Sequence, residues 1–189
     1  MPAHRRYDRL RKRIFFYPCS EQEAAKATSG QSWFLHVRRL DHDASDLRHV
    51  LACKLNDDCV MPQFSSYIGH FSSIEANCAG EFLHTVLLWL GDYKHRFEFL
   101  LNNVLRLEGG STYLVEQQIL NELKGLTNVI VNDIEAILFL NEANHNGGQE
   151  SGTYSDNVSR VYEMYANTLR DFDAFLSNAL SYLRILRIQ

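Results

Sequence analysis

The C-terminal part of the chain carries an unbroken heptad repeat of apolar side chains, and this repeat constrains the fold more than any other feature. Its members are alternately four and three residues apart, which places them along one face of an α-helix. They are Val158, Tyr162, Tyr165, Leu169, Phe172, Leu176, Ala179, Leu183 and Leu186. Because a strand alternates with a period of two, the repeat predicts one long helix over 156–188.

Two earlier segments, 72–107 and 112–144, show related patterns. Segment 72–107 opens with Ser72-x-x-Glu75, the spacing of a capping box. Segment 112–144 repeats the heptad pattern, with Asp133 as the only polar member. A pair of glycines follows each segment, so the pattern predicts three long helices joined by short turns, in an up-down-up order with antiparallel neighbours.

The N-terminal part predicts shorter elements. Leu47, Val50, Leu51 and Leu55 share one helical face, which predicts a helix over 43–56. A second capping box at 20–23 predicts another short helix. The sequence does not decide whether residues 14–37 contribute strands. The expected fold is all-α: an antiparallel helical bundle with three long helices plus one or two short N-terminal helices. It occupies a single domain over 20–189, after an arm and short extended segment over 1–19.

The formal net charge of −4 is distributed unevenly. Residues 1–13 hold one acidic residue and six basic ones, a net of +5, which leaves −9 on the remainder. The basic residues are Arg5, Arg6, Arg9, Arg11, Lys12 and Arg13. Such an arm is typical of a targeting segment, of a tail that docks on the acidic body, or of a segment that binds an anionic partner such as nucleic acid. Because the acidic body would repel phosphates, nucleic acid is a candidate partner only through the arm.

The four cysteines, Cys19, Cys53, Cys59 and Cys78, are interpreted as reduced thiols. No apolar leader follows Met1, and a chain of 189 residues can form a core without disulfides. The expected location is therefore intracellular, with the cytoplasm favoured over the nucleus or an organelle matrix. No apolar run reaches the eighteen or so residues that a membrane span requires.

Motifs of phosphate-binding loops, dinucleotide folds, nucleophile elbows and zinc ribbons are all missing from the sequence. One set of residues has the spacing of metal ligands: His42, Asp46 and His49 on one helical stripe, with Glu81-x-x-His84 elsewhere. Paired Glu-x-x-His motifs hold two irons in some helical bundles. This predicts, as the alternative function, a bundle metalloprotein with iron or another transition metal, such as a di-iron-type oxidase. The competing interpretation is a solvated polar face without a cofactor.

The last predicted helix has more apolar residues than one seam requires. Those off the seam are Val161, Phe175, Leu180, Tyr182 and Ile185. A helix that is apolar nearly all round is buried on several sides, by its own bundle or by a partner. The leading hypothesis is a non-catalytic helical interaction or assembly protein, an adaptor or complex subunit. It would bind a protein partner, or itself as a homo-oligomer, through these apolar helix faces.

Overall fold

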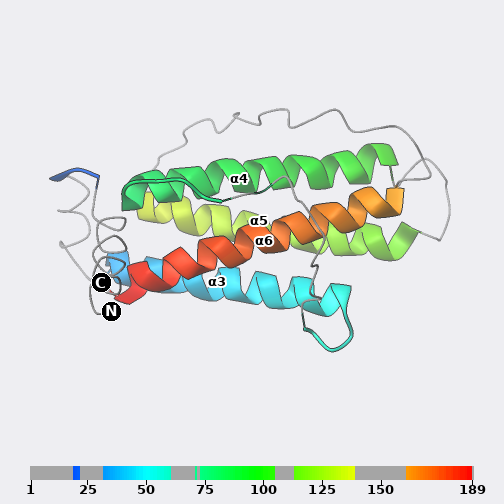
Figure 1. Ribbon diagram of the computed structural model, residues 1–189, viewed down its shortest axis with the longest axis horizontal. Coiled ribbons are helices and arrows are strands. Elements are labelled where there is room, and N and C mark those ends of the chain that lie inside the picture. The colour runs from blue at the N-terminus through cyan, green and yellow to red at the C-terminus, as the bar shows by residue number, and fades with distance from the viewer. Residues whose placement is uncertain are drawn as a thin grey trace, which may run out of the picture.

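The computed structural model describes residues 19–21, 32–60, 71, 73–104, 113–138 and 161–188. Within these ranges the chain forms a bundle of four long α-helices and no strand (Figure 1). They are α3 (Ser32–Leu55), α4 (Ala79–Phe99), α5 (Leu114–Leu138) and α6 (Val161–Ile188), with α4 continuing into a short π-helix, η1 (Leu100–Val104). None of these helices is both long and apolar enough to cross a bilayer. The all-α bundle predicted from the sequence is thus confirmed.

The heptad seam of α6 forms one side of the core. Every seam member from Tyr165 to Leu183 is buried. The seams of α4 and α5 contribute Leu83, Leu90 and Phe97, and Leu123, Ile130 and Ile137. Burying one Leu or Phe side chain stabilises a fold by about 1.5–3 kcal/mol, so this shared core holds the four helices together.

The first helix is longer than the sequence predicted. It begins at Ser32 rather than near Asp43, and its added turns bury Val37 and Leu40 in the core. Residues 32–37 are therefore helical, while 14–18 lie outside the described residues. The bundle thus has four long helices instead of three.

The helix directions differ from the predicted order. α3 and α4 run one way along the bundle, and α5 and α6 run back the other way (Figure 1). α3 packs against α5 and α6, and α4 packs against the same two helices. Contacting neighbours are antiparallel, as expected, but the up-down-up order was wrong: the order is up-up-down-down. The linking segments 56–78 and 139–160 are long enough to return along a bundle, whereas short turns would force successive helices to alternate.

The segment before α4 runs alongside α6 instead of forming the predicted first helical turns. The backbone N–H of Phe71 donates to Asp171 Oδ1 at 2.8 Å, and that of Ile74 donates to Asn178 Oδ1 at 3.2 Å. Because these donors already have partners on α6, the helix begins only at Ala79. The predicted Ser72–Glu75 capping box was therefore wrong.

A buried polar network centred on Asp171 joins this segment to α4 and α6. Tyr93 donates its hydroxyl to Asp171 Oδ2 at 2.7 Å, and Arg96 Nη1 lies 3.3 Å from the same oxygen. Arg96 also pairs with Asp92 at 3.0 Å. Burial, followed by the charge of Asp171, raises the pKa of Tyr93 well above its usual range, so the phenol stays a donor. The network fixes where the first crossover meets the bundle.

All four cysteines are oxidised. Cys19 is bonded to Cys78 immediately before α4, and Cys53 near the end of α3 is bonded to Cys59 in the turn that follows. The prediction of reduced thiols was therefore wrong. It rested on the size of the core, and core size does not decide which thiols lie within bonding distance.

Candidate functional site

Most of the described residues of the predicted interaction face on α6 are buried within the bundle. Phe175 is 0% exposed and packs against Phe71, Trp89 and Tyr93, and Leu180 is also buried. Tyr182 is half-buried and meets Phe82 edge-on. The side chains of Val161 and Ile185 lie outside the described part. The expectation that Phe175 and Leu180 face a partner was therefore wrong. Phe71 and α4 cover Phe175, and Leu180 lies beside α3, at a pocket that Ser45 and Ala52 also line.

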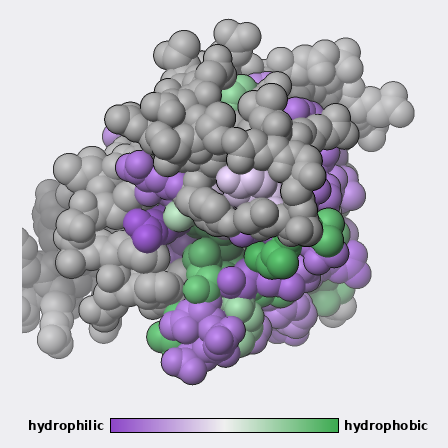
Figure 2. All heavy atoms as spheres, turned by 90° about the vertical axis from the view of Figure 1, so that its right-hand side faces the viewer, coloured by the Kyte–Doolittle hydropathy of each residue, from purple (hydrophilic) through white to green (hydrophobic). Residues whose placement is uncertain are grey.

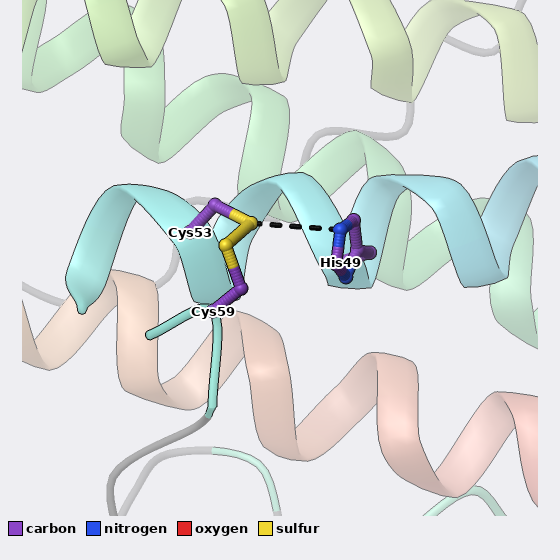
Figure 3. A group of neighbouring side chains, drawn as sticks. All are labelled: His49, Cys53 and Cys59. Atoms are coloured by element: carbon purple, nitrogen blue, oxygen red, sulfur yellow. Dashed lines mark hydrogen bonds between the residues drawn. A yellow bond between two sulfur atoms is a disulfide. The ribbon is translucent and has the colours of Figure 1, made fainter. Parts of the chain in front are cut away.

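The predicted metal ligands fall in three places. His42 Nδ1 lies 3.3 Å from Asp46 Oδ2 and 3.6 Å from Asp43 Oδ1. One turn further along α3, His49 neighbours the Cys53–Cys59 disulfide instead (Figure 3).

Glu81 and His84 lie apart from both groups. They belong to the first turns of α4, the helix diagonally opposite α3, and both are exposed. Glu81 Oε2 accepts a hydrogen bond from the backbone N–H of Asn77 at 3.1 Å, so it caps its own helix. Within the described residues, no second Glu-x-x-His motif lies beside Glu81 and His84, as a di-iron centre would require.

Asp133, the polar member of the α5 seam, is a buried carboxyl group beside α3. It is 8% exposed, and within the described ranges its Oδ2 has no hydrogen-bond partner. Burial, together with hydrogen bonding to Asp43 and the charge of Asp43, raises the pKa of Asp133 from 3.8 to about 7, although Arg39 opposes the shift. At neutral pH a substantial fraction of Asp133 is therefore protonated between α3 and α5.

We expect this pair to make the bundle less stable as the pH rises from about 4 to about 7. The folded protein binds a proton that the unfolded chain has already lost, so the uptake of this proton on folding becomes more costly over that range. Asp133→Asn is expected to flatten this part of the stability curve and to add on the order of 2 kcal/mol above pH 7. Urea unfolding at several pH values measures it. Identical pH profiles for the two proteins would contradict the prediction.

The outer face of α5 has fewer charged residues than the exposed face of α3. Its exposed residues are Leu114, Val115, Gln118, Asn121, Glu122, Gly125, Asn128, Val129 and Asn132. Glu122 is the one charged member, and it pairs with Lys54 at 2.9 Å. By contrast, the exposed face of α3 includes four charged residues, Arg38, Arg39, Asp46 and Lys54. We call these nine residues the α5 outer face.

This face also exposes large apolar side chains. Val115 is 61% exposed and Val129 is 44% exposed, two heptads apart on the same side of the helix. The surface at the end where α5 begins includes apolar areas between hydrophilic ones (Figure 2). A solvated helix face is normally rich in charge, whereas the centres of protein interfaces are depleted in it. The composition of the α5 outer face is thus that of an interface.

Sequence reasoning concentrated on α6 and did not single out the α5 outer face. A signal was present, because uncharged Gln118, Asn121, Asn128 and Asn132 take positions that Lys and Glu usually take on a solvated helix. The basic arm, Arg5 to Arg13, lies outside the described residues, so its role as a targeting or anionic-partner segment stays a prediction. No protein-family model, no curated protein and no solved structure matches this chain.

Proposed function

We propose that the protein is a non-catalytic helical ligand that acts in an oxidising compartment, outside the cell or in the secretory pathway. It binds another protein through the α5 outer face. The observation that carries this proposal is the nearly uncharged, partly apolar composition of that face. The proposal keeps the interaction function expected from the sequence and moves its surface from α6 to α5.

The disulfides support the compartment. Cys19–Cys78 and Cys53–Cys59 use all four cysteines of the chain. Structural disulfides persist in secreted and lumenal proteins, whereas the cytosol keeps most thiols reduced. We therefore favour an extracellular or lumenal partner over a cytoplasmic one.

The topology supports the class of ligand. The up-up-down-down order of the four helices is the order of growth-hormone and cytokine bundles. This is an analogy at the level of the fold, and one fold carries many functions. The analogy supports the proposal because such bundles bind other proteins through the outer faces of their helices, as the α5 outer face would.

Gly125 provides the test. It lies in the middle of the α5 outer face, and no neighbouring side chain lies within 4 Å of the position that a Cβ would take. Gly125→Arg therefore places a large charge at the centre of the face without a clash in the bundle. We expect it to weaken partner binding at least tenfold, about 1.4 kcal/mol. Gly125→Ala removes a flexible residue from a helix, so it is expected to stabilise the fold by up to about 1 kcal/mol.

The measurement is saturable binding of the labelled protein to intact cells of the organism that makes it, with unlabelled protein as competitor. Gly91→Arg on α4 is the matched control, because Gly91 also has open space around its Cβ position. Loss of binding with Gly125→Arg and not with Gly91→Arg supports the proposal. Equal binding by both variants, or no saturable binding by the natural protein, refutes it. A dimer in sedimentation that only Gly125→Arg dissociates would show that the partner is a second copy.

A further inference from the structure

The Cys53–Cys59 disulfide lies beside a histidine at the end of α3. The ring nitrogen Nε2 of His49 is 3.6 Å from Cys53 Sγ, one helical turn away on the same face (Figure 3). Potential ligand atoms of His49, Cys53 and Cys59 all lie within 4.8 Å of one another. An imidazole next to a disulfide sulfur can stabilise the thiolate that forms when the bond opens.

The two sulfurs of this disulfide have different surroundings. Cys59 lines a surface pocket of about 290 Å³, and Cys53 is not among the residues that line it. Arg48, His49 and Arg184 are also in the pocket wall. Arg48 pairs with Asp173 at 2.8 Å, so the two arginines and this aspartate together leave one positive charge. An anion held in the pocket therefore lies beside Cys59 rather than Cys53.

The backbone at Cys59 favours opening of the bond. Its φ angle of 56° lies in the left-handed region, which costs a residue other than glycine on the order of 1 kcal/mol. The two cysteines are only 6 residues apart in the sequence, so their disulfide restricts the unfolded chain little. Exposed or strained disulfides are the ones that exchange most readily.

The second disulfide provides an internal contrast. Cys78 Sγ of the Cys19–Cys78 disulfide has Glu81 Oε2 at 3.6 Å, a carboxylate where Cys53 has an imidazole. A negative charge there disfavours both an approaching and a departing thiolate at Cys78, whereas Cys19 Sγ accepts a hydrogen bond from the backbone N–H of Glu81 at 3.4 Å. The Cys19–Cys78 bridge has no imidazole among these neighbours, so we expect Cys53–Cys59 to react with thiols faster.

We propose that Cys53–Cys59 is a thiol–disulfide exchange site for an anionic low-molecular-weight thiol, such as glutathione, held in the Arg48/Arg184 pocket. The thiolate attacks Cys59 Sγ and forms a new S–S bond to it. The Cys53–Cys59 bond breaks, and Cys53 leaves as a thiolate beside His49. One thiolate enters and one leaves, so no further oxidant or reductant is needed. The product is a mixed disulfide on Cys59 and a thiolate at Cys53, which becomes a free thiol when it takes a proton from solvent.

The test is the second-order rate of opening of each disulfide in the folded protein, with glutathione and with uncharged 2-mercaptoethanol as the two thiols. Acid quenching, alkylation and peptide mass spectrometry identify which sulfur carries the added thiol. We expect Cys53–Cys59 to open at least tenfold faster than Cys19–Cys78, with the adduct on Cys59. Comparable rates for the two disulfides, or an adduct on Cys53, would overturn the proposal.

Two variants separate the contributions of the pocket and the imidazole. Arg184→Glu is expected to slow the reaction with glutathione several-fold and the reaction with 2-mercaptoethanol clearly less, because both react as thiolates but only glutathione also carries carboxylates. His49→Gln is expected to slow both reactions. Arg38→Glu, an exposed charge change elsewhere on α3, is the matched control. If Arg184→Glu affects both thiols equally, or no more than Arg38→Glu does, the pocket does not select the thiol.

Discussion

Replacing Asp171 with alanine is expected to lower the free energy of unfolding by about 3–5 kcal/mol, most of the stability of an ordinary domain. The Asp171 carboxylate is 1% exposed and accepts from the Tyr93 hydroxyl, the Arg96 guanidinium and the backbone N–H of Phe71. Its loss would leave all three donors buried with fewer acceptors, and Arg96 would lose one of its two described carboxylate partners and keep Asp92. Guanidinium chloride unfolding followed by circular dichroism measures the effect.

Tyr93→Phe is the graded control for this network. It removes one hydroxyl donor and leaves Asp171 paired with Arg96, so we expect a loss of only about 1 kcal/mol. A loss below about 1 kcal/mol for Asp171→Ala, or an equal loss for both variants, would show that the carboxylate does not organise the network. Destabilisation by Asp171→Ala should also release the segment at Phe71 from α6, which hydrogen exchange at the backbone amides of Phe71 and Ile74 would detect.

The second large effect concerns the Cys19–Cys78 disulfide. Its sequence separation is 59, against 6 for Cys53–Cys59. In the chain-entropy model, a cross-link that closes a longer loop restricts the unfolded chain more. Replacing both Cys19 and Cys78 with serine is therefore expected to cost about 4 kcal/mol, and replacing both Cys53 and Cys59 about 2 kcal/mol.

Thermal unfolding of the two double-serine variants tests this ranking. Equal or reversed losses would mean that native contacts around each bridge outweigh the entropy of the unfolded chain. The expected ranking also allows Cys53–Cys59 to open without loss of the fold. A chemically reactive bridge and a structural one can then coexist in the same bundle.

The helices and their core follow from the sequence to a large extent. The heptad seam of α6 predicts both the helix and its buried face, because the 3.6-residue period leaves one side of a helix facing its neighbours. Asp133 was identified as the exceptional polar position in the α5 seam, and it is the buried carboxyl group with the raised pKa. Periodicity is a local property, so it can be read without knowledge of the neighbours.

Features that depend on tertiary contacts could not be read in the same way. The start of α4 is decided by Asp171 and Asn178, which lie about a hundred residues away along the chain and take the N–H groups of Phe71 and Ile74. α6 runs in the same direction as α5, whereas the glycines in the sequence between them suggested a short turn and an antiparallel pair. Four cysteines allow three pairings, so the observed bridges also depended on the fold.

The candidate sites show the same difference between features that depend on local sequence and features that depend on tertiary contacts. His42 and Asp46, which are spaced like metal ligands on one helix, do lie close together. Convergence with Glu81 would require α3 and α4 to be neighbours, and these two helices lie diagonally to each other. The surplus of apolar residues on α6 correctly indicated several buried sides. It did not indicate what buried them, because a sequence does not distinguish a neighbour in the same chain from a partner.

The order of helix directions has a consequence for how the chain acquires its structure. The two helices of the N-terminal half, α3 and α4, pack against α5 and α6 and lie diagonally to each other. Neither half of the chain can therefore bury its apolar faces alone, and stabilising contacts span long stretches of sequence. Such contacts require long loops to close first, which slows folding relative to bundles whose successive helices pair. During synthesis, the core can close only after α6 has been made.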